Sequence, residues 1–154
     1  MRNLAKILIY TILASEILFA GTAITPVGKW KTIDDKTHEI SSIVELWIDN
    51  HGQLRGKVEK VITKPGEDPN PVCDKCTDEN KNKPINGMEI LWGFKQEKQN
   101  DPTKWVSGKI LDPDEGEIYS CELTVLDGGK SLKVRGYIGI PLLGRSQTWL
   151  RTDQ

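Results

Sequence analysis

The sequence predicts an all-β protein, an antiparallel up-and-down barrel of about eight strands that follows an N-terminal signal peptide. Two observations predict the barrel. First, no alanine occurs after residue 23, although the chain contains 14 Gly and 8 Pro. Alanine is the best helix former, so this composition argues against helical bundles and α/β folds. Second, short segments of alternating apolar and polar residues are separated by short turns, which makes successive strands antiparallel neighbours that close into a meander.

The length of 154 residues allows one ordinary domain, and 21 Lys+Arg nearly balance 22 Asp+Glu. Both signs are scattered along the chain, so no basic surface for nucleic acid is predicted. We therefore expect no nucleic-acid partner.

Residues 1–23 have the pattern of a secretory signal peptide. Arg2 and Lys6 precede an apolar run from Ile7 to Ala20, and small residues follow, with cleavage expected after Ala20 or Ala23. The run is shorter than the roughly 20 residues of a spanning helix, although an uncleaved anchor remains an alternative. The expected location is the periplasm or the exterior, without stable membrane insertion after cleavage, and residues 24–154 form the single barrel domain.

The first half of the domain contains three predicted strands and one long loop. In the second strand Val44, Leu46 and Ile48 share one face, and a turn at 49–52 makes a hairpin with the third strand. The predicted strands are 27–33, 42–49 and 53–63. The loop that follows, 64–86, is rich in proline and too long for a tight turn, which indicates a functional or disulfide-stapled loop.

The second half returns to the strand pattern. The predicted strands are 87–96, 104–111, 117–126, 131–138 and 146–151. On the first of them, Met88, Ile90, Trp92 and Phe94 share one parity, which predicts a core-facing side. The turns at 112–116 and 127–130 are rich in residues that tolerate positive φ.

A CxxC motif, Cys73 to Cys76, lies in the long loop. In an exported protein this motif has three alternative interpretations: a redox-active pair, half of a zinc site or a small structural disulfide. The prolines before it and the absence of a leading apolar strand disfavour redox catalysis, and zinc would need two further ligands. A local disulfide is therefore the favoured interpretation, with Cys121 as a buried free thiol; no metal site and no cofactor are predicted.

Five tryptophans are many for this length, and aromatic side chains often line the cavities of barrels. Trp47 and Trp105 lie on the more polar face of their strands. We therefore expect them either to face a ligand in a barrel interior of mixed polarity or to be partly exposed. Arg135 is a candidate for binding a carboxylate or phosphate headgroup together with Tyr137 and Arg145, although surface placement of an arginine is more common. The candidate ligand-binding residues are Trp47, Trp105, Arg135, Tyr137 and Arg145.

The segment Gly28 to Trp30 matches the G-x-W that lipocalins carry on their first strand, where the indole closes one end of the barrel. In that fold an arginine of the last strand packs over the indole, and Arg151 occupies a suitable position. Gly28, Trp30 and Arg151 are therefore expected to be structural residues of a lipocalin- or calycin-like barrel end.

Motifs along the whole domain resemble the exported bacterial proteins of the family called domain of unknown function 2147. The matching segments are V-G-K-W-K-T at 27–32, D-P-N-P-V-C-D-K-C at 68–76, G-K-I-L-D-P at 108–113, L-K-V-R-G-Y-I-G at 132–139 and L-G-R-S-Q-T-W-L-R at 143–151. The resemblance implies an exported lipocalin-like barrel and brings no established activity.

Two functions follow as hypotheses. The first is binding of a small apolar or amphipathic molecule in the bacterial envelope. The alternative is a solid-cored interaction module that uses the 64–86 loop to contact a protein or glycan. The sequence contains no G-x-S-x-G, H-E-x-x-H or phosphate-binding loop, so no enzyme and no catalytic residue are predicted, with thiol chemistry at the CxxC as the remaining alternative.

Overall fold

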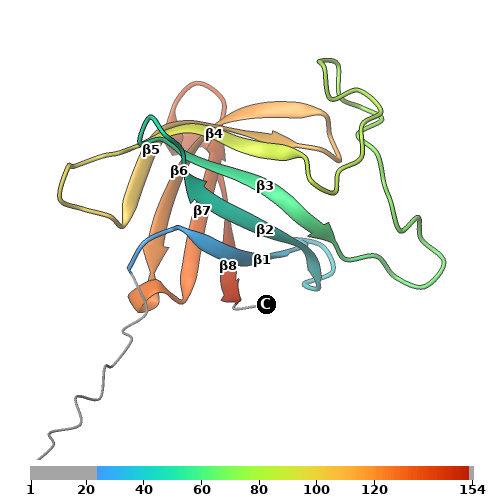
Figure 1. Ribbon diagram of the computed structural model, residues 1–154, viewed down its shortest axis with the longest axis horizontal. Helices are drawn as coiled ribbons and strands as arrows, with labels where there is room; N and C mark the ends of the chain where they lie inside the picture. Colours follow the sequence, from blue (N-terminus) through green and yellow to red (C-terminus); the bar gives the residue numbers. More distant parts are fainter. Residues whose placement is uncertain (1–23, 153–154) are drawn as a thin grey trace, which may run out of the picture.

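The computed structural model describes residues 24–152, and these form a closed antiparallel barrel in which each strand pairs with its sequence neighbours and β8 pairs with β1 (Figure 1). The strands are β1 (Gly28–Ile33), β2 (Ile40–Ile48), β3 (Leu54–Val61), β4 (Glu89–Gln96), β5 (Lys104–Asp112), β6 (Glu117–Leu126), β7 (Ser131–Tyr137) and β8 (Arg145–Thr152). Two short 3-10 helices, η1 (Asp127–Gly129) and η2 (Pro141–Leu143), lie in the last two connections. The predicted fold class is confirmed. The predicted signal peptide, residues 1–23, lies outside the described residues.

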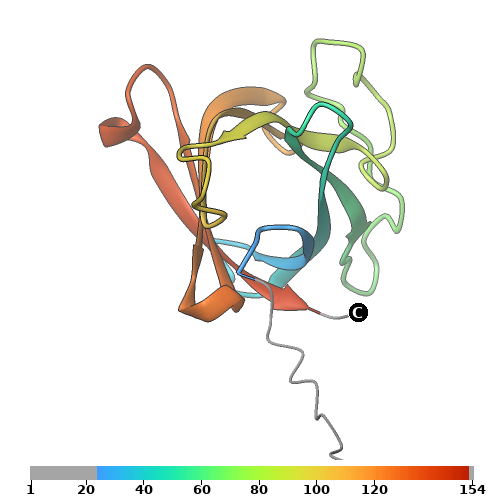
Figure 2. The same cartoon turned by 60° about the vertical axis from the view of Figure 1, so that its left-hand side comes forward.

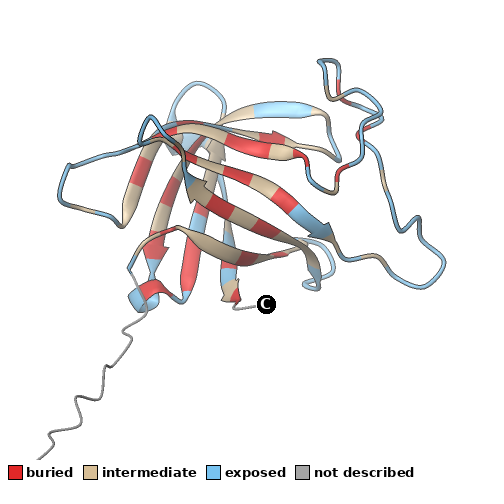
Figure 3. Cartoon of the chain, viewed as in Figure 1, coloured by how far each residue is buried: buried red, intermediate tan, exposed pale blue. Residues whose placement is uncertain are grey.

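Most side chains that point into the barrel are buried, and most outward-facing side chains are half-buried or exposed (Figure 3). In β2, for example, Val44 and Leu46 are buried, whereas Trp47 between Leu46 and Ile48 is only half-buried. This period-2 alternation is the reason that the sequence pattern located the strands.

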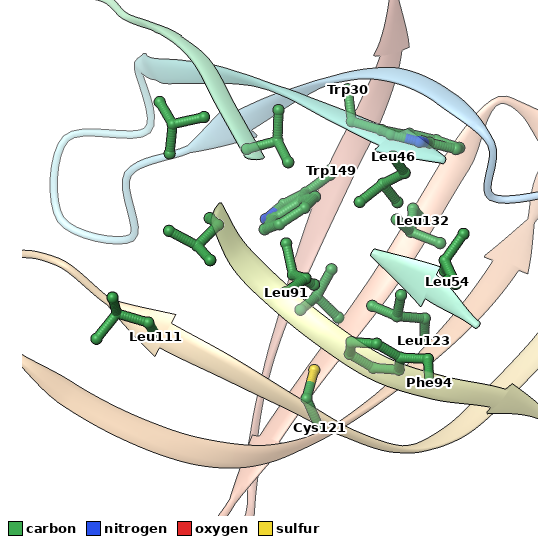
Figure 4. Close-up of a cluster of buried hydrophobic side chains, with 14 of the residues drawn as sticks. Trp30, Leu46, Leu54, Leu91, Phe94, Leu111, Cys121, Leu123, Leu132 and Trp149 are labelled. Carbon is green, nitrogen blue, oxygen red and sulfur yellow. The ribbon is translucent and has the colours of Figure 1, made fainter. Parts of the chain in front are cut away.

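The interior is filled by large apolar side chains (Figure 4). Trp149 lies at the centre of this cluster, close to Leu46 and Leu91, and Trp30 covers one end. Phe94, Cys121 and Leu123 continue the packing on the opposite side. The core of the barrel is therefore solid over most of its length.

The strands contain several β-bulges, and those in β4 and β5 change the face of nearby tryptophans. Gly93 and Ser107 have positive φ angles of 78° and 63°. Across β5 and β6, Trp105 pairs with Leu123 and Gly108 with Cys121, so the two residues 106 and 107 of β5 lie opposite one residue of β6. A bulge of this kind inserts one extra residue and moves the following side chains to the other face.

The bulges correct two expectations from the sequence. Trp105, expected in a mixed lumen or partly exposed, is buried at 3% exposure, and its Nε1 donates a 3.0 Å hydrogen bond to the Pro102 carbonyl. Trp92, expected on the core face with Phe94, instead pairs with Lys109 and lies half-buried on the outer side. Simple parity counting fails at both positions because the bulge residues interrupt the period of two.

Candidate functional site

One end of the barrel is closed by Trp30 and Arg151. The Arg151 guanidinium lies 4.2 Å from the centroid of the Trp30 ring, and Trp30 Nε1 donates a 2.8 Å hydrogen bond to the Pro26 carbonyl. Arg151 also donates to the carbonyls of Thr25, Val27 and Gly129. Gly28 has a positive φ of 123°, which favours glycine, and a Cβ there would lie 2.8 Å from Arg151 Nη1. The three residues predicted for the barrel end thus lie together.

The opposite end, which we call the mouth, is bordered by the connections 34–39, 62–88, 113–116 and 138–144. Its inner wall carries polar side chains. In β8, Arg145 and Gln147 have the same parity as buried Trp149, so they face the barrel axis above the indole. The polar residues of the mouth therefore lie directly on the apolar core.

A chain of hydrogen bonds links these polar residues. Arg145 Nη2 donates to Asp35 Oδ2 at 2.6 Å, and Gln147 Nε2 donates to the same oxygen at 2.9 Å. Trp149 Nε1 donates to Gln147 Oε1 at 3.3 Å. Asp35 thus orients the side chains of Arg145 and Gln147. The Arg145 side chain is 73% exposed despite this contact. A guanidinium has five N–H donors, so Arg145 retains donors for a ligand.

Gly136 is the glycine of the inner wall at the mouth. It lies opposite Arg145 in β7, and a Cβ there would have its nearest contact, Tyr119 Cβ, at 3.7 Å. Deeper in the barrel, a Cβ on Gly56 or Gly108 would come within 2.3 Å of Leu46 or Phe94. The glycines of the core therefore admit neighbouring side chains, whereas Gly136 could accept a methyl group in ordinary van der Waals contact.

Tyr119 forms the wall beside Gly136. Its side chain has the parity of buried Cys121 and Leu123, and its hydroxyl donates a 2.7 Å hydrogen bond to Glu115 Oε2. This hydrogen bond, with burial and the negative charge of Glu115, raises the pKa of Tyr119 to about 12. The phenol is therefore neutral at physiological pH and presents an apolar ring edge with its hydroxyl fixed by Glu115.

The residues expected to bind ligand are not brought together. Only Arg145 faces the mouth. Trp47 lies on the outer face, with Lys57 Nζ 5.8 Å from its ring centroid, and Trp105 is part of the core. Arg135 and Tyr137 alternate with buried Val134, which places them on the outer side of β7.

Asp35, Gln147 and Gly136 are the residues of the mouth that sequence reasoning missed. A signal for Gln147 exists, because Arg145, Gln147 and Trp149 alternate in one strand and therefore share a face. Asp35 carries no such signal, since it belongs to a turn that only the pairing of β1 with β8 brings to Arg145.

The long loop is folded onto the outside of the barrel. Cys73 and Cys76 form the predicted disulfide, and both are buried. Cys73 Sγ lies 3.3 Å from the Pro113 carbonyl oxygen, and a Cβ on Gly116 would lie 2.3 Å from the Lys75 carbonyl oxygen, so the loop rests on the β5–β6 turn. Because Cys73 and Cys76 are joined in the disulfide, neither offers a thiolate that could bind zinc.

The loop covers apolar side chains that face outward. Leu91 and Ile110 pair inside the barrel, so their neighbours Ile90 and Leu111 face outward. Ile90 and Leu111 are nevertheless buried. A hollow of about 320 Å³ beside the loop is lined by Asn80, Lys83, Pro84, Asn86, Gly87, Met88 and Glu89. Removing the whole loop would expose Ile90 and Leu111, so its contacts stabilise the barrel.

Cys121 is buried in the core, and burial raises the pKa of its thiol. Because the thiolate is the reactive form, we expect the native protein to be inert to Ellman's reagent at pH 8. In denaturant, the protein should release about one equivalent of thiol, with the disulfide intact. Rapid reaction of the folded protein would show that Cys121 is accessible or that the disulfide is open.

Within residues 24–152, no cluster of three or more His, Cys, Asp or Glu side chains is arranged to hold a metal ion. The same residues include no helix with the length and apolarity needed to cross a bilayer.

An eight-stranded meander barrel, closed at one end by a tryptophan under an arginine, defines a lipocalin-like protein. A solved structure with this fold is protein HP1028 of Helicobacter pylori, which is described as belonging to the lipocalin family; it shares 18% sequence identity, with a TM-score of 0.68 over 83% of each chain. Residues 28–151 match the family described as "Uncharacterized protein conserved in bacteria (DUF2147)", and the chain belongs to this family. A comparison with curated proteins found no match.

Proposed function

We propose that the protein binds a small amphipathic molecule with an anionic headgroup at the mouth of the barrel. The observation that carries this proposal is Arg145, a largely exposed arginine that faces the barrel axis and is held in place by Asp35. A guanidinium forms two parallel hydrogen bonds with a carboxylate or phosphate, which suits it to such a headgroup.

The filled core limits the size of the apolar part of the ligand. Trp149, Leu91 and Leu132 occupy the axis below the mouth, so a long chain has no room there. The apolar wall at the mouth consists of Ile110, Tyr119 and the backbone at Gly136, where no side chain projects. We infer that a short or branched apolar group rests on this wall while Arg145 binds the anionic end.

We also propose that the protein acts in the envelope after export. The apolar segment of residues 1–23 supports this, as does the Cys73–Cys76 disulfide, because disulfides persist in oxidising compartments. Native mass spectrometry of protein purified from the envelope tests both proposals. It should find a chain starting at Gly21 or Ile24 with a small organic anion bound, whereas a full-length, ligand-free chain would count against both.

Replacing Arg145 with alanine should weaken binding of the ligand roughly 10- to 100-fold, because a hydrogen bond to a charged group contributes about 1.5–3 kcal/mol. Isothermal titration with short-chain fatty acids and isoprenoid phosphates measures the effect. Arg55→Ala is the matched control, since Arg55 faces outward on β3 and pairs with Glu89. Equal loss in both variants, or none in Arg145→Ala, would argue against the mouth as the site.

A further inference from the structure

The connection between β7 and β8 exposes an unusual amount of apolar surface. Ile138, Ile140, Leu142 and Leu143 are between 54% and 81% exposed, and no charged residue occurs from Tyr137 to Gly144. We call residues 138–143 the tip. Single exposed apolar residues are common, but a contiguous cluster marks an interaction surface.

The tip is held in a defined conformation. Arg135 Nε donates a 2.8 Å hydrogen bond to the Pro141 carbonyl, and its Nη2 donates to the Leu142 carbonyl at 3.3 Å. Arg135 Nη1 also donates to Ser146 Oγ at 2.9 Å, which ties the tip to the start of β8. Within the tip, the Leu143 N–H bonds to the Ile140 carbonyl. An arginine thus fixes the backbone while the aliphatic side chains point to solvent.

The strands that carry the tip are basic. The charged residues of β7, β8 and the adjoining β1 are all cations. Lys29, Lys31, Lys133 and Arg135 lie on the outer face, whereas Arg145 faces the barrel axis and Arg151 packs on Trp30. Lys133 pairs with Thr148 and Lys31 with Leu150, so these lysines flank β8 on its outer face. The carboxylates nearest to this face are engaged or on neighbouring elements. Asp35 binds Arg145, and Glu59 binds Lys29. Glu45 of β2 lies opposite Lys29 and binds Lys57, and Glu122 of β6 lies across from Arg135.

We infer that the tip and the cationic face of β7, β8 and β1 dock onto an anionic phospholipid bilayer, an interaction that goes beyond ligand binding at the mouth. The tip is convex and projects away from the barrel wall (Figure 2), so its side chains suit a deformable apolar phase. The aliphatic side chains enter the acyl region, and Lys31 and Lys133 contact lipid phosphates. Apolar insertion and electrostatic attraction together give reversible surface binding, where either alone is weak.

Vesicle flotation of the mature protein tests this inference. We expect binding to vesicles of phosphatidylcholine with phosphatidylglycerol, and weaker binding at high salt or to phosphatidylcholine alone. The variant Leu142→Ser/Leu143→Ser should reduce the partition coefficient about a hundredfold, since it removes two aliphatic groups that enter the bilayer. Lys31→Ala/Lys133→Ala should reduce it roughly thirtyfold on anionic vesicles and leave binding to neutral vesicles unchanged.

Ile48→Ser is the matched control, because Ile48 is also exposed, at 47%, but lies at the closed end. It should bind vesicles like the wild type. Failure of the wild type to float, or normal flotation of the Leu142→Ser/Leu143→Ser variant, would overturn the inference. A lipid-independent change in oligomeric state for that variant, measured by sedimentation velocity, would show that a second copy of the chain covers the tip instead.

Discussion

Replacing Trp30 with alanine is expected to lower the free energy of unfolding by about 3–5 kcal/mol. The indole is fully buried, its Nε1 is bonded to Pro26, and Arg151 packs on its face. The substitution removes a large apolar group and leaves the Arg151 guanidinium over a cavity. Domains of this size have a stability of about 5–15 kcal/mol, so urea unfolding should show a large loss.

Trp47→Ala is the control for this prediction. Trp47 is on the outer face of β2 and is half-buried, with Lys57 over its ring. Its replacement should cost about 1 kcal/mol or less. Similar losses at Trp30 and Trp47 would mean that the indole of Trp30 does not seal the barrel end.

Gly108→Ala should destabilise the protein by about 1–3 kcal/mol, even though alanine is only one methyl group larger than glycine. The added Cβ would lie 2.3 Å from the Phe94 ring, so that ring would have to leave its packed position. Gly108 has no positive φ, and the cost is therefore steric rather than conformational. Chemical unfolding measured by tryptophan fluorescence gives the change.

The steric explanation is tested by a double-mutant cycle. In a Phe94→Leu background the smaller side chain leaves space, so Gly108→Ala should cost less there than in the wild type. Gly136→Ala is the second control; its Cβ would have ordinary contacts at 3.7 Å or more, and it should be close to neutral. Additive effects of the changes at 94 and 108 would contradict the proposed clash.

The strands were predictable from the sequence because each has one buried and one solvated face. The segment 117–126 was predicted with its observed bounds, and 104–111 and 131–138 differ from β5 and β7 by one residue. The buried disulfide was also predictable, since Cys73 and Cys76 are near neighbours in the chain. These features depend on local pattern alone.

The faces of Trp92 and Trp105 were not predictable by alternation. Bulges at Gly93 and Ser107 shift the register, and a bulge depends on how a strand fits its neighbour. The burial of Leu111 has a similar origin, because the long loop covers an outward face that the strand pattern treats as solvated.

The sequence by itself determined the class of fold, the strand order and the residues at the closed end, because periodicity, turn composition and a local motif encode them. Only the tertiary structure decided what the mouth contains. Asp35 and Arg145 are 110 residues apart and meet because closure of the barrel places β1 beside β8. The tertiary structure also placed the five residues predicted to bind ligand on different faces, with Trp105 in the core, Trp47, Arg135 and Tyr137 outside, and Arg145 at the mouth. Whether the interior is filled depends on side chains from all strands together, which no single segment of the sequence specifies.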